Sequence, residues 1–174
     1  MVIWITGISG SGKSTFGKYF FNKFKKLKKN TIFFDGDEFR KIFLDDIKYT
    51  LQDRNKNATR LTSLVKYLSD QKVNIIISAN ITSQRFRSWC RKNVKNYFEV
   101  FIDVPIEILL QRDYKKLYKN ALEKKIKNVV GIDIKFVKPK KPDFIIDNTS
   151  SKKKLYKYYP KIINQIKKKN IKIF

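Results

Sequence analysis

The residues best suited to chemistry stand near the start of the chain. Residues 7–14 read Gly-Ile-Ser-Gly-Ser-Gly-Lys-Ser and match the pattern GxxxxGK[ST] without a mismatch. Glycines let successive backbone N–H groups turn towards one polyanion, and the N-terminus of a following helix adds positive potential. Lys13 can then reach the outer phosphates of a nucleoside triphosphate, while the Ser14 hydroxyl can ligate Mg²⁺. The residues predicted to contact ATP here are Gly7, Ser9, Gly10, Ser11, Gly12, Lys13, Ser14 and Thr15.

Two carboxylates follow the next apolar run of the chain. Residues 31–35 read as a strand and continue into Asp35-Gly36-Asp37-Glu38-Phe39-Arg40. Carboxylates two residues apart can serve a water bound to Mg²⁺ and an acceptor hydroxyl, and Arg40 can hold an acceptor anion. Alone, an acidic turn that caps a helix explains the pattern equally well. Because these carboxylates follow a complete phosphate-binding motif, the interpretation that they are catalytic is favoured.

The elements that must position these residues alternate between strand and helix patterns, which is typical of βαβ units around a parallel sheet. We predict strands at 2–6, 31–35, 73–78, 98–104 and 144–147. Helices are predicted at 13–28, 58–70, 83–93 and 105–112, with a C-terminal helix that ends near Lys169. The chain is therefore predicted to be α/β: a three-layer P-loop NTPase fold with a parallel sheet of about five strands and helices on both faces. We expect a single domain over 1–174, with the basic, irregular segment 114–142 as a lid.

Further polar residues follow the predicted strand ends, where ligands of parallel sheets gather. Residues 53–57 read Asp-Arg-Asn-Lys-Asn, so that Arg54 and Asn57 can line an anion site. From the residues alone, a charged entrance to a helix is the simpler interpretation. Residues 80–85 follow the third predicted strand in the same way.

Composition limits the classes of partner. The formal charge is +25, but 33 Lys stand against only 7 Arg, and base and phosphate recognition relies on Arg forks. Together with the abundance of Asn, Ile, Phe and Tyr, this is typical of an AT-rich genome, so nucleic acid is not the expected partner. No apolar run approaches the roughly 20 residues that span a bilayer. With one cysteine, Cys90, and a first strand instead of a signal peptide at the start, the chain is expected to be cytoplasmic.

The order of these motifs resembles the adenylylsulfate (APS) kinase family. The similar stretches are residues 7–15, 35–40, 53–57, 98–105, 111–113, 117–118 and 131–133. They cover most of the chain, and the combination is far more specific than any one motif. The resemblance implies phosphorylation of the 3′-hydroxyl of APS by Mg·ATP, which gives PAPS and ADP.

The resemblance also implies roles for individual residues. Asp37 would orient or deprotonate the 3′-hydroxyl, Lys13 would neutralise phosphate charge, and Asp35 with Ser14 would hold Mg²⁺, directly or through water. Arg112 would stack near the ATP base, and the lid would close over both nucleotides. The residues implied for acceptor binding are Arg40, Arg54, Asn57, Ile81, Thr82 and Phe136. A homodimer is an assembly that the resemblance allows.

Departures from the family pattern lie on the acceptor side and in the lid. The segment S-P-[YF]-R is Thr82-Ser83-Gln84-Arg85, the pattern DRxxNIRR lacks one arginine, and the D-P-Y-E segment is Ile-Lys-Phe-Val at 134–137. An alternative is therefore a kinase of the same family that acts on cytidine diphosphoramidate, to whose branch residues 88–93 and 127–131 are similar. The retained DRxxN favours APS. A third interpretation is a nucleotide- or RNA-binding protein without catalysis, which the intact Lys13, Ser14, Asp35 and Asp37 disfavour.

Overall fold

The computed structural model describes residues 1–43, 46–113, 116–150 and 152–174, and this part of the chain forms a five-stranded parallel sheet. The strands are β1 (Val2–Thr6), β2 (Thr31–Asp35), β3 (Asn74–Ser78), β4 (Tyr97–Asp103) and β5 (Phe144–Asp147), in the order β2-β3-β1-β4-β5. Because β1 is central, the loop that follows it opens at the middle of the carboxyl edge. The predicted P-loop NTPase fold is confirmed.

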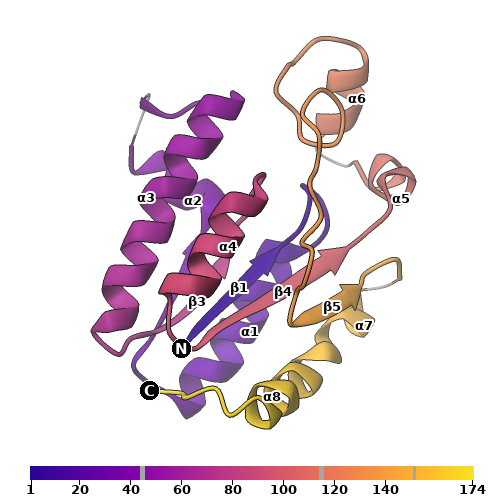
Figure 1. The fold of residues 1–174 in the computed structure, drawn as a ribbon. Coiled ribbons are helices and arrows are strands. Elements are labelled where there is room, and N and C mark those ends of the chain that lie inside the picture. The colour runs from indigo at the N-terminus through magenta and orange to yellow at the C-terminus, as the bar shows by residue number, and fades with distance from the viewer. Residues whose placement is uncertain (44–45, 114–115, 151) are drawn as a thin grey trace.

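Helices cover both faces of this sheet (Figure 1). In chain order they are α1 (Lys13–Leu27), α2 (Gly36–Lys41), α3 (Leu51–Asp70), α4 (Gln84–Asn93), α5 (Ile106–Gln111), α6 (Leu117–Leu122), α7 (Lys152–Tyr156) and α8 (Tyr158–Lys168). In the described residues, no helix combines the length and the apolar character that crossing a membrane requires.

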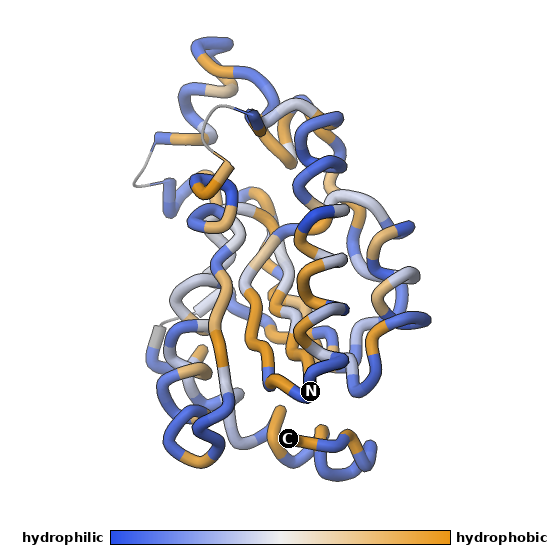
Figure 2. The backbone as a smooth tube through the Cα atoms, turned by 90° about the vertical axis from the view of Figure 1, so that its left-hand side faces the viewer, coloured by the Kyte–Doolittle hydropathy of each residue, from blue (hydrophilic) through white to orange (hydrophobic). Residues whose placement is uncertain are grey.

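Alternation along the central strand divides its side chains between two cores. Ile3 and Ile5 pack with α1 and α8, whereas Val2 and Trp4 pack with α3 and α4. Every residue of β1 is buried, as expected for a parallel strand covered on both faces. The apolar strands therefore form the middle of the molecule (Figure 2).

The predicted elements are largely confirmed, with differences where side chains cap or break a helix. Helix α3 begins earlier than predicted, at Leu51, because Thr50 and Asp53 form a reciprocal capping box in front of it. Pro105 is the N-cap of α5 and not a residue of its first turn. The predicted C-terminal helix is two helices, which meet at Lys157.

The segment predicted as irregular, 114–142, contains α6. Asp113 Oδ2 accepts a hydrogen bond from the backbone N–H of Lys119 at 2.8 Å, and Tyr118 and Ala121 are buried. These contacts stabilise a short helix that periodicity does not reveal. Tyr114 and Lys115, the first residues of the predicted lid, lie outside the described residues.

The packing of α1 generates a test of the core. Phe20 is fully buried, with ring centroids 5.9 Å from Phe16, 6.0 Å from Phe24 and 4.7 Å from Tyr159. Phe20→Ala should lower the free energy of unfolding by about 3–5 kcal/mol, because it leaves a cavity. Leu27→Ala in the same helix, where the side chain is 72% exposed, should change it by less than about 0.5 kcal/mol. Urea denaturation measures both, and equal effects would contradict this core.

Candidate active site

The loop at residues 7–12 joins β1 to α1 at the carboxyl edge. Gly12 is the N-cap of α1 and has a left-handed backbone, with φ 99°. A β-carbon at Gly12 would also lie 2.8 Å from Asn148 Nδ2, so a larger residue meets both strain and a clash. Among the described residues no side chain caps α1, which leaves its first N–H groups available to an anion.

The side chain of the residue that follows the loop and side chains from two distant segments hold its carbonyl groups. The bonds run from Lys13 Nζ to Ile8 O (2.8 Å), from Tyr118 Oη to Ser9 O (2.7 Å) and from Asn148 Nδ2 to Ser11 O (2.8 Å). Because these carbonyls are hydrogen-bonded to protein groups, the loop can keep one conformation, in which the Ser11 N–H donates to Ile8 O at 3.2 Å and the first N–H groups of α1 are left for a ligand.

The Lys13 ammonium lies in a buried and partly compensated environment. Burial lowers the pKa of Lys13 to about 8, and the charges of Asp37 and Asp35 act in the opposite direction. At neutral pH Lys13 therefore stays mainly protonated, close enough to both carboxylates to interact with them. This is the charge arrangement that a polyphosphate and its cation would complete.

Asp35 ends β2 and caps α2. Its Oδ1 accepts a hydrogen bond from the N–H of Asp37 at 3.0 Å, while its buried Oδ2 has no partner among the described residues. A buried carboxylate oxygen without a donor is costly, so a ligand is expected there. A magnesium ion or a water molecule bound to it fits this oxygen, because no lysine or arginine among the described residues donates a hydrogen bond to it.

Two of the predicted acceptor residues meet on an aromatic ring that the sequence reasoning missed. The guanidinium groups of Arg40 and Arg54 lie 4.7 Å and 5.6 Å from the ring centroid of Tyr49, which is 52% exposed. Arg54 also donates to Asn128 O at 2.8 Å and to Tyr49 O at 3.0 Å. The available signal was an aromatic residue in the loop between the two arginines. This cluster offers positive charge and a flat face to an anionic nucleotide.

The remaining acceptor residues near the carboxylates are buried. Asn57 lies one turn beyond Arg54 on α3, and its Oδ1 has no partner in the described part of the chain. Ile81 and Thr82 follow β3 and are 1% and 7% exposed. The structure thus brings them to the same edge of the sheet as Asp35.

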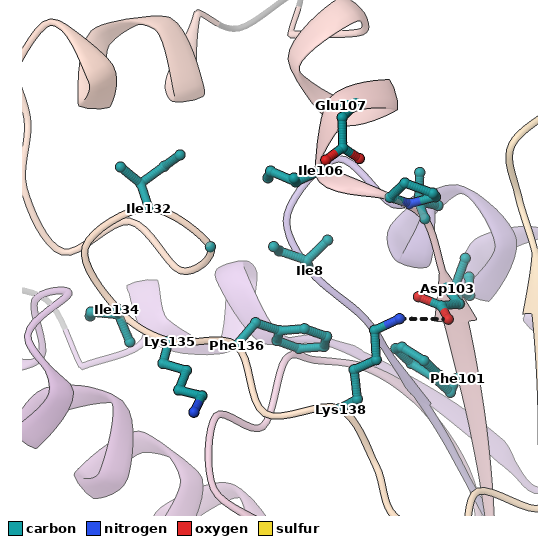
Figure 3. Close-up of a pocket in the computed structure, with 14 residues that line it drawn as sticks. Ile8, Phe101, Asp103, Ile106, Glu107, Ile132, Ile134, Lys135, Phe136 and Lys138 are labelled. Atoms are coloured by element: carbon teal, nitrogen blue, oxygen red, sulfur yellow. Dashed lines mark hydrogen bonds and ion pairs between the residues drawn. The ribbon is translucent and has the colours of Figure 1, made fainter.

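Phe136 lies in a different setting from the other predicted acceptor residues. It lines a cavity of about 420 Å³ between the end of β4 and the segment 131–138. Figure 3 shows its ring beside Phe101, with the centroids 6.1 Å apart, and the ion pair of Lys138 with Asp103 at 2.9 Å. Ile8 of the phosphate loop also lines this cavity, whereas the residues lining it include none of the other predicted acceptor residues.

Arg112 lies against the segment that follows β5. It donates to Asn148 O at 2.7 Å and to Ser150 O at 2.9 Å. Asn148 Nδ2 also donates a hydrogen bond to Ser11 O. Arg112 and the segment after β5 therefore lie together beside the phosphate loop. That position is compatible with the predicted contact to the ATP base.

Asp53 has a structural role in this arrangement. Its Oδ2 accepts from the backbone N–H of Thr50 at 3.2 Å and from the Thr50 hydroxyl at 2.6 Å, and its own N–H donates to Thr50 Oγ1. A helix cap of this kind stabilises α3 whatever the acceptor is. The Asp of the DRxxN motif therefore carries no information on the acceptor.

The environment of Lys13 predicts how binding depends on pH. A bound polyphosphate should raise the lowered pKa of Lys13, so Mg·ATP binding near pH 8 should take up about half a proton. Near pH 6.5, where Lys13 is already protonated, the uptake should approach zero. Calorimetric titrations in buffers of different ionisation enthalpy measure it, and an uptake that is the same at both pH values would contradict the assignment.

Comparisons with known proteins agree with this geometry. The adenylylsulphate kinase family model matches residues 1–147. The cytidine diphosphoramidate kinase of Campylobacter jejuni is 41% identical over 85% of this chain and 86% of its own length. An adenylyl-sulfate kinase of Buchnera aphidicola is 37% identical over 94% and 80%.

A solved structure extends the likeness to three dimensions. The APS kinase CysC of Mycobacterium tuberculosis, in complex with AMPPNP and APS, matches with a TM-score of 0.83 and 29% identity, over 95% of this chain and 96% of that one. The chain therefore belongs to the adenylylsulphate kinase family and is a P-loop phosphotransferase that uses ATP and a hydroxyl acceptor.

Proposed function

We propose that the chain phosphorylates a ribose hydroxyl of a nucleotide whose 5′-phosphate is linked to a second tetrahedral group, either a sulfate or a phosphoramidate. The carboxylate turn carries this proposal: Asp35 Oδ1 accepts the N–H of Asp37 at 3.0 Å, the buried Asp35 Oδ2 has no partner among the described residues, and the charge of Asp37 acts on both Lys13 and Arg54. A carboxylate within range of both groups is suited to an acceptor hydroxyl between them.

The proposed roles follow from these positions. Asp37 orients or deprotonates the acceptor hydroxyl, and Lys13 neutralises charge on the transferred phosphoryl group. Ser14 and the free oxygen of Asp35 would hold Mg²⁺, which would neutralise charge on the phosphates. Burial and the neighbouring Arg40 lower the pKa of Arg54, so an anion at this cluster relieves a repulsion. Arg40, Arg54, Asn57, Ile81 and Thr82 would bind the acceptor, and Arg112 would face the ATP base.

The segment 116–142 would close over both nucleotides and exclude water. Its attachment to the phosphate loop supports this, because the Tyr118 hydroxyl on α6 holds Ser9 O. We propose that residues 1–174 form one catalytic unit, because α1 near the start of the chain and α8 near its end pack on the same sheet. Self-association into a homodimer stays a prediction.

Two acceptors have the proposed chemistry, adenylylsulfate and cytidine diphosphoramidate. Adenylylsulfate is supported by the family model and by the relatives from Buchnera and Mycobacterium. We rank the cytidine nucleotide first, because the Campylobacter relative is 41% identical and the departures from the APS kinase pattern lie on the acceptor side. The retained DRxxN motif favours adenylylsulfate through Arg54 and Asn57, whereas its Asp53 caps a helix and does not distinguish the two acceptors.

Separate incubations with Mg·ATP and each acceptor test the reaction. We expect ADP release together with a product one phosphate heavier than the acceptor, and Lys13→Ala should abolish it because the phosphates lose their cation. Mass spectrometry identifies the product, and phosphorus NMR identifies the hydroxyl that has been phosphorylated. Release of ADP that does not depend on either acceptor would contradict the proposal.

The role of Asp37 has a matched control in the next residue. Asp37→Asn should lower kcat by about 10²–10⁴-fold, as expected for loss of a general base, and should change the ATP dissociation constant by less than about twofold. Glu38 is exposed and pairs with Lys41 at 2.8 Å, so Glu38→Gln should keep kcat. Steady-state kinetics and ATP titrations measure both, and full activity of Asp37→Asn would exclude the role.

A further inference from the structure

A buried arginine outside the predicted site is not explained by stability. Arg87 on α4 is 1% exposed and Glu99 on β4 is 2% exposed, and Arg87 Nε lies 3.4 Å from Glu99 Oε1. Burial lowers the pKa of Arg87 and raises that of Glu99, so each group loses hydration. Because buried ion pairs often stabilise less than apolar residues of similar volume, the pair calls for another role.

Arg87 reaches the loop that follows β3. Its Nη2 donates a hydrogen bond to the carbonyl of Ile81. At the other end of this loop the indole N–H of Trp4 donates to Ala79 O at 3.0 Å. The loop is therefore held at both ends by buried donors, one from the central strand and one from α4.

The same loop lies directly against the carboxylate turn. A β-carbon at Gly36, between Asp35 and Asp37, would lie 2.8 Å from the β-carbon of Ala79. The backbone at Gly36 therefore packs against Ala79 with no room for a side chain, so a movement of the loop would press on the turn. A shift of the Ile81 carbonyl would therefore reach the carboxylates.

Glu99 is itself fixed, which limits the movement of Arg87. Its Oε2 accepts from Arg91 Nη2 at 3.2 Å, and Arg91 also donates to Lys141 O at 2.9 Å and to Asp143 Oδ2 at 3.0 Å. Asp143 Oδ2 in turn accepts the backbone N–H of Glu99 at 2.8 Å. Among the hydrogen bonds and ion pairs of the described residues, Arg91 thus reaches Glu99 but not the loop at 79–82.

We propose that Arg87 is a positioning residue for phosphoryl transfer, which holds the Ile81 carbonyl so that the loop at 79–82 stays against the Asp35–Asp37 turn. Errors of about 1 Å in the position of reacting groups lower the rate of transfer. A fixed loop would therefore favour transfer although the loop itself does not contact ATP. The proposal rests on the proposed function in one respect, that this turn faces the acceptor.

Arg87→Met and Arg91→Met form a matched pair, since both remove a guanidinium from Glu99 but only the first removes a donor from Ile81. Hydrogen exchange of the peptide 79–83, without substrates, should accelerate at least about tenfold in Arg87→Met and stay unchanged in Arg91→Met. In Arg91→Met the exchange should accelerate at 141–143 instead.

Kinetics give the second readout. With the acceptor that the wild-type protein turns over, Arg87→Met should lower kcat/KM for the acceptor by about tenfold or more, while the ATP dissociation constant changes by less than about twofold. Arg87→Lys keeps a donor and should recover part of the loss. If Arg87→Met does not fold, Arg87→Met with Glu99→Gln removes the unbalanced carboxylate and replaces it in both assays.

Unchanged exchange at 79–83, or unchanged acceptor kinetics in a folded variant, would overturn the proposal. An equal loss in Arg91→Met would do so as well, because it would indicate a general structural effect. The exchange experiment needs no acceptor. A wild-type protein that turns over neither nucleotide would therefore count against the proposed function and not against the role of Arg87 in holding the loop.

Discussion

Hydrogen bonding of the phosphate loop is the constraint on which the rest of the structure depends. To present N–H groups to a polyanion, the loop at 7–12 must find donors for its carbonyls elsewhere, since an unmade buried bond costs about 1–3 kcal/mol. The donors are Lys13, Tyr118 and Asn148, which come from α1, α6 and the end of β5. The strand order β2-β3-β1-β4-β5 brings these segments together at one edge.

The acceptor side is built differently. Arg40 Nε and Asn57 Oδ1 are buried atoms without a protein partner among the described residues, and both belong to residues proposed to bind the acceptor. Polar atoms left in this state at a ligand site are available to a ligand. We propose that the substrate supplies the partners of these acceptor-side atoms, which would let relatives that keep the reaction differ in the nucleotide.

Most of the fold could be predicted from the sequence because its signals are local. The limits of β1, β2 and β5 follow from apolar runs and the residues that end them, and the phosphate loop from its glycines. Helix α6 and the early start of α3 depend on capping by Asp113 and by Thr50 with Asp53, which periodicity does not detect. Tyr49 and Arg87 were missed because their roles come from contacts with Arg40, Arg54 and Ile81 across loops, whose course periodicity does not predict even at short sequence separation.

A competition experiment tests the central claim most directly, that the protein transfers phosphate to the hydroxyl of a nucleotide chosen on the acceptor side. Equal, low concentrations of adenylylsulfate and cytidine diphosphoramidate are mixed with Mg·ATP and the protein, and the ratio of the products gives the ratio of kcat/KM. We predict that one phosphorylated nucleotide dominates and that it is the cytidine product. ATP that is bound but transferred to neither nucleotide would contradict the claim.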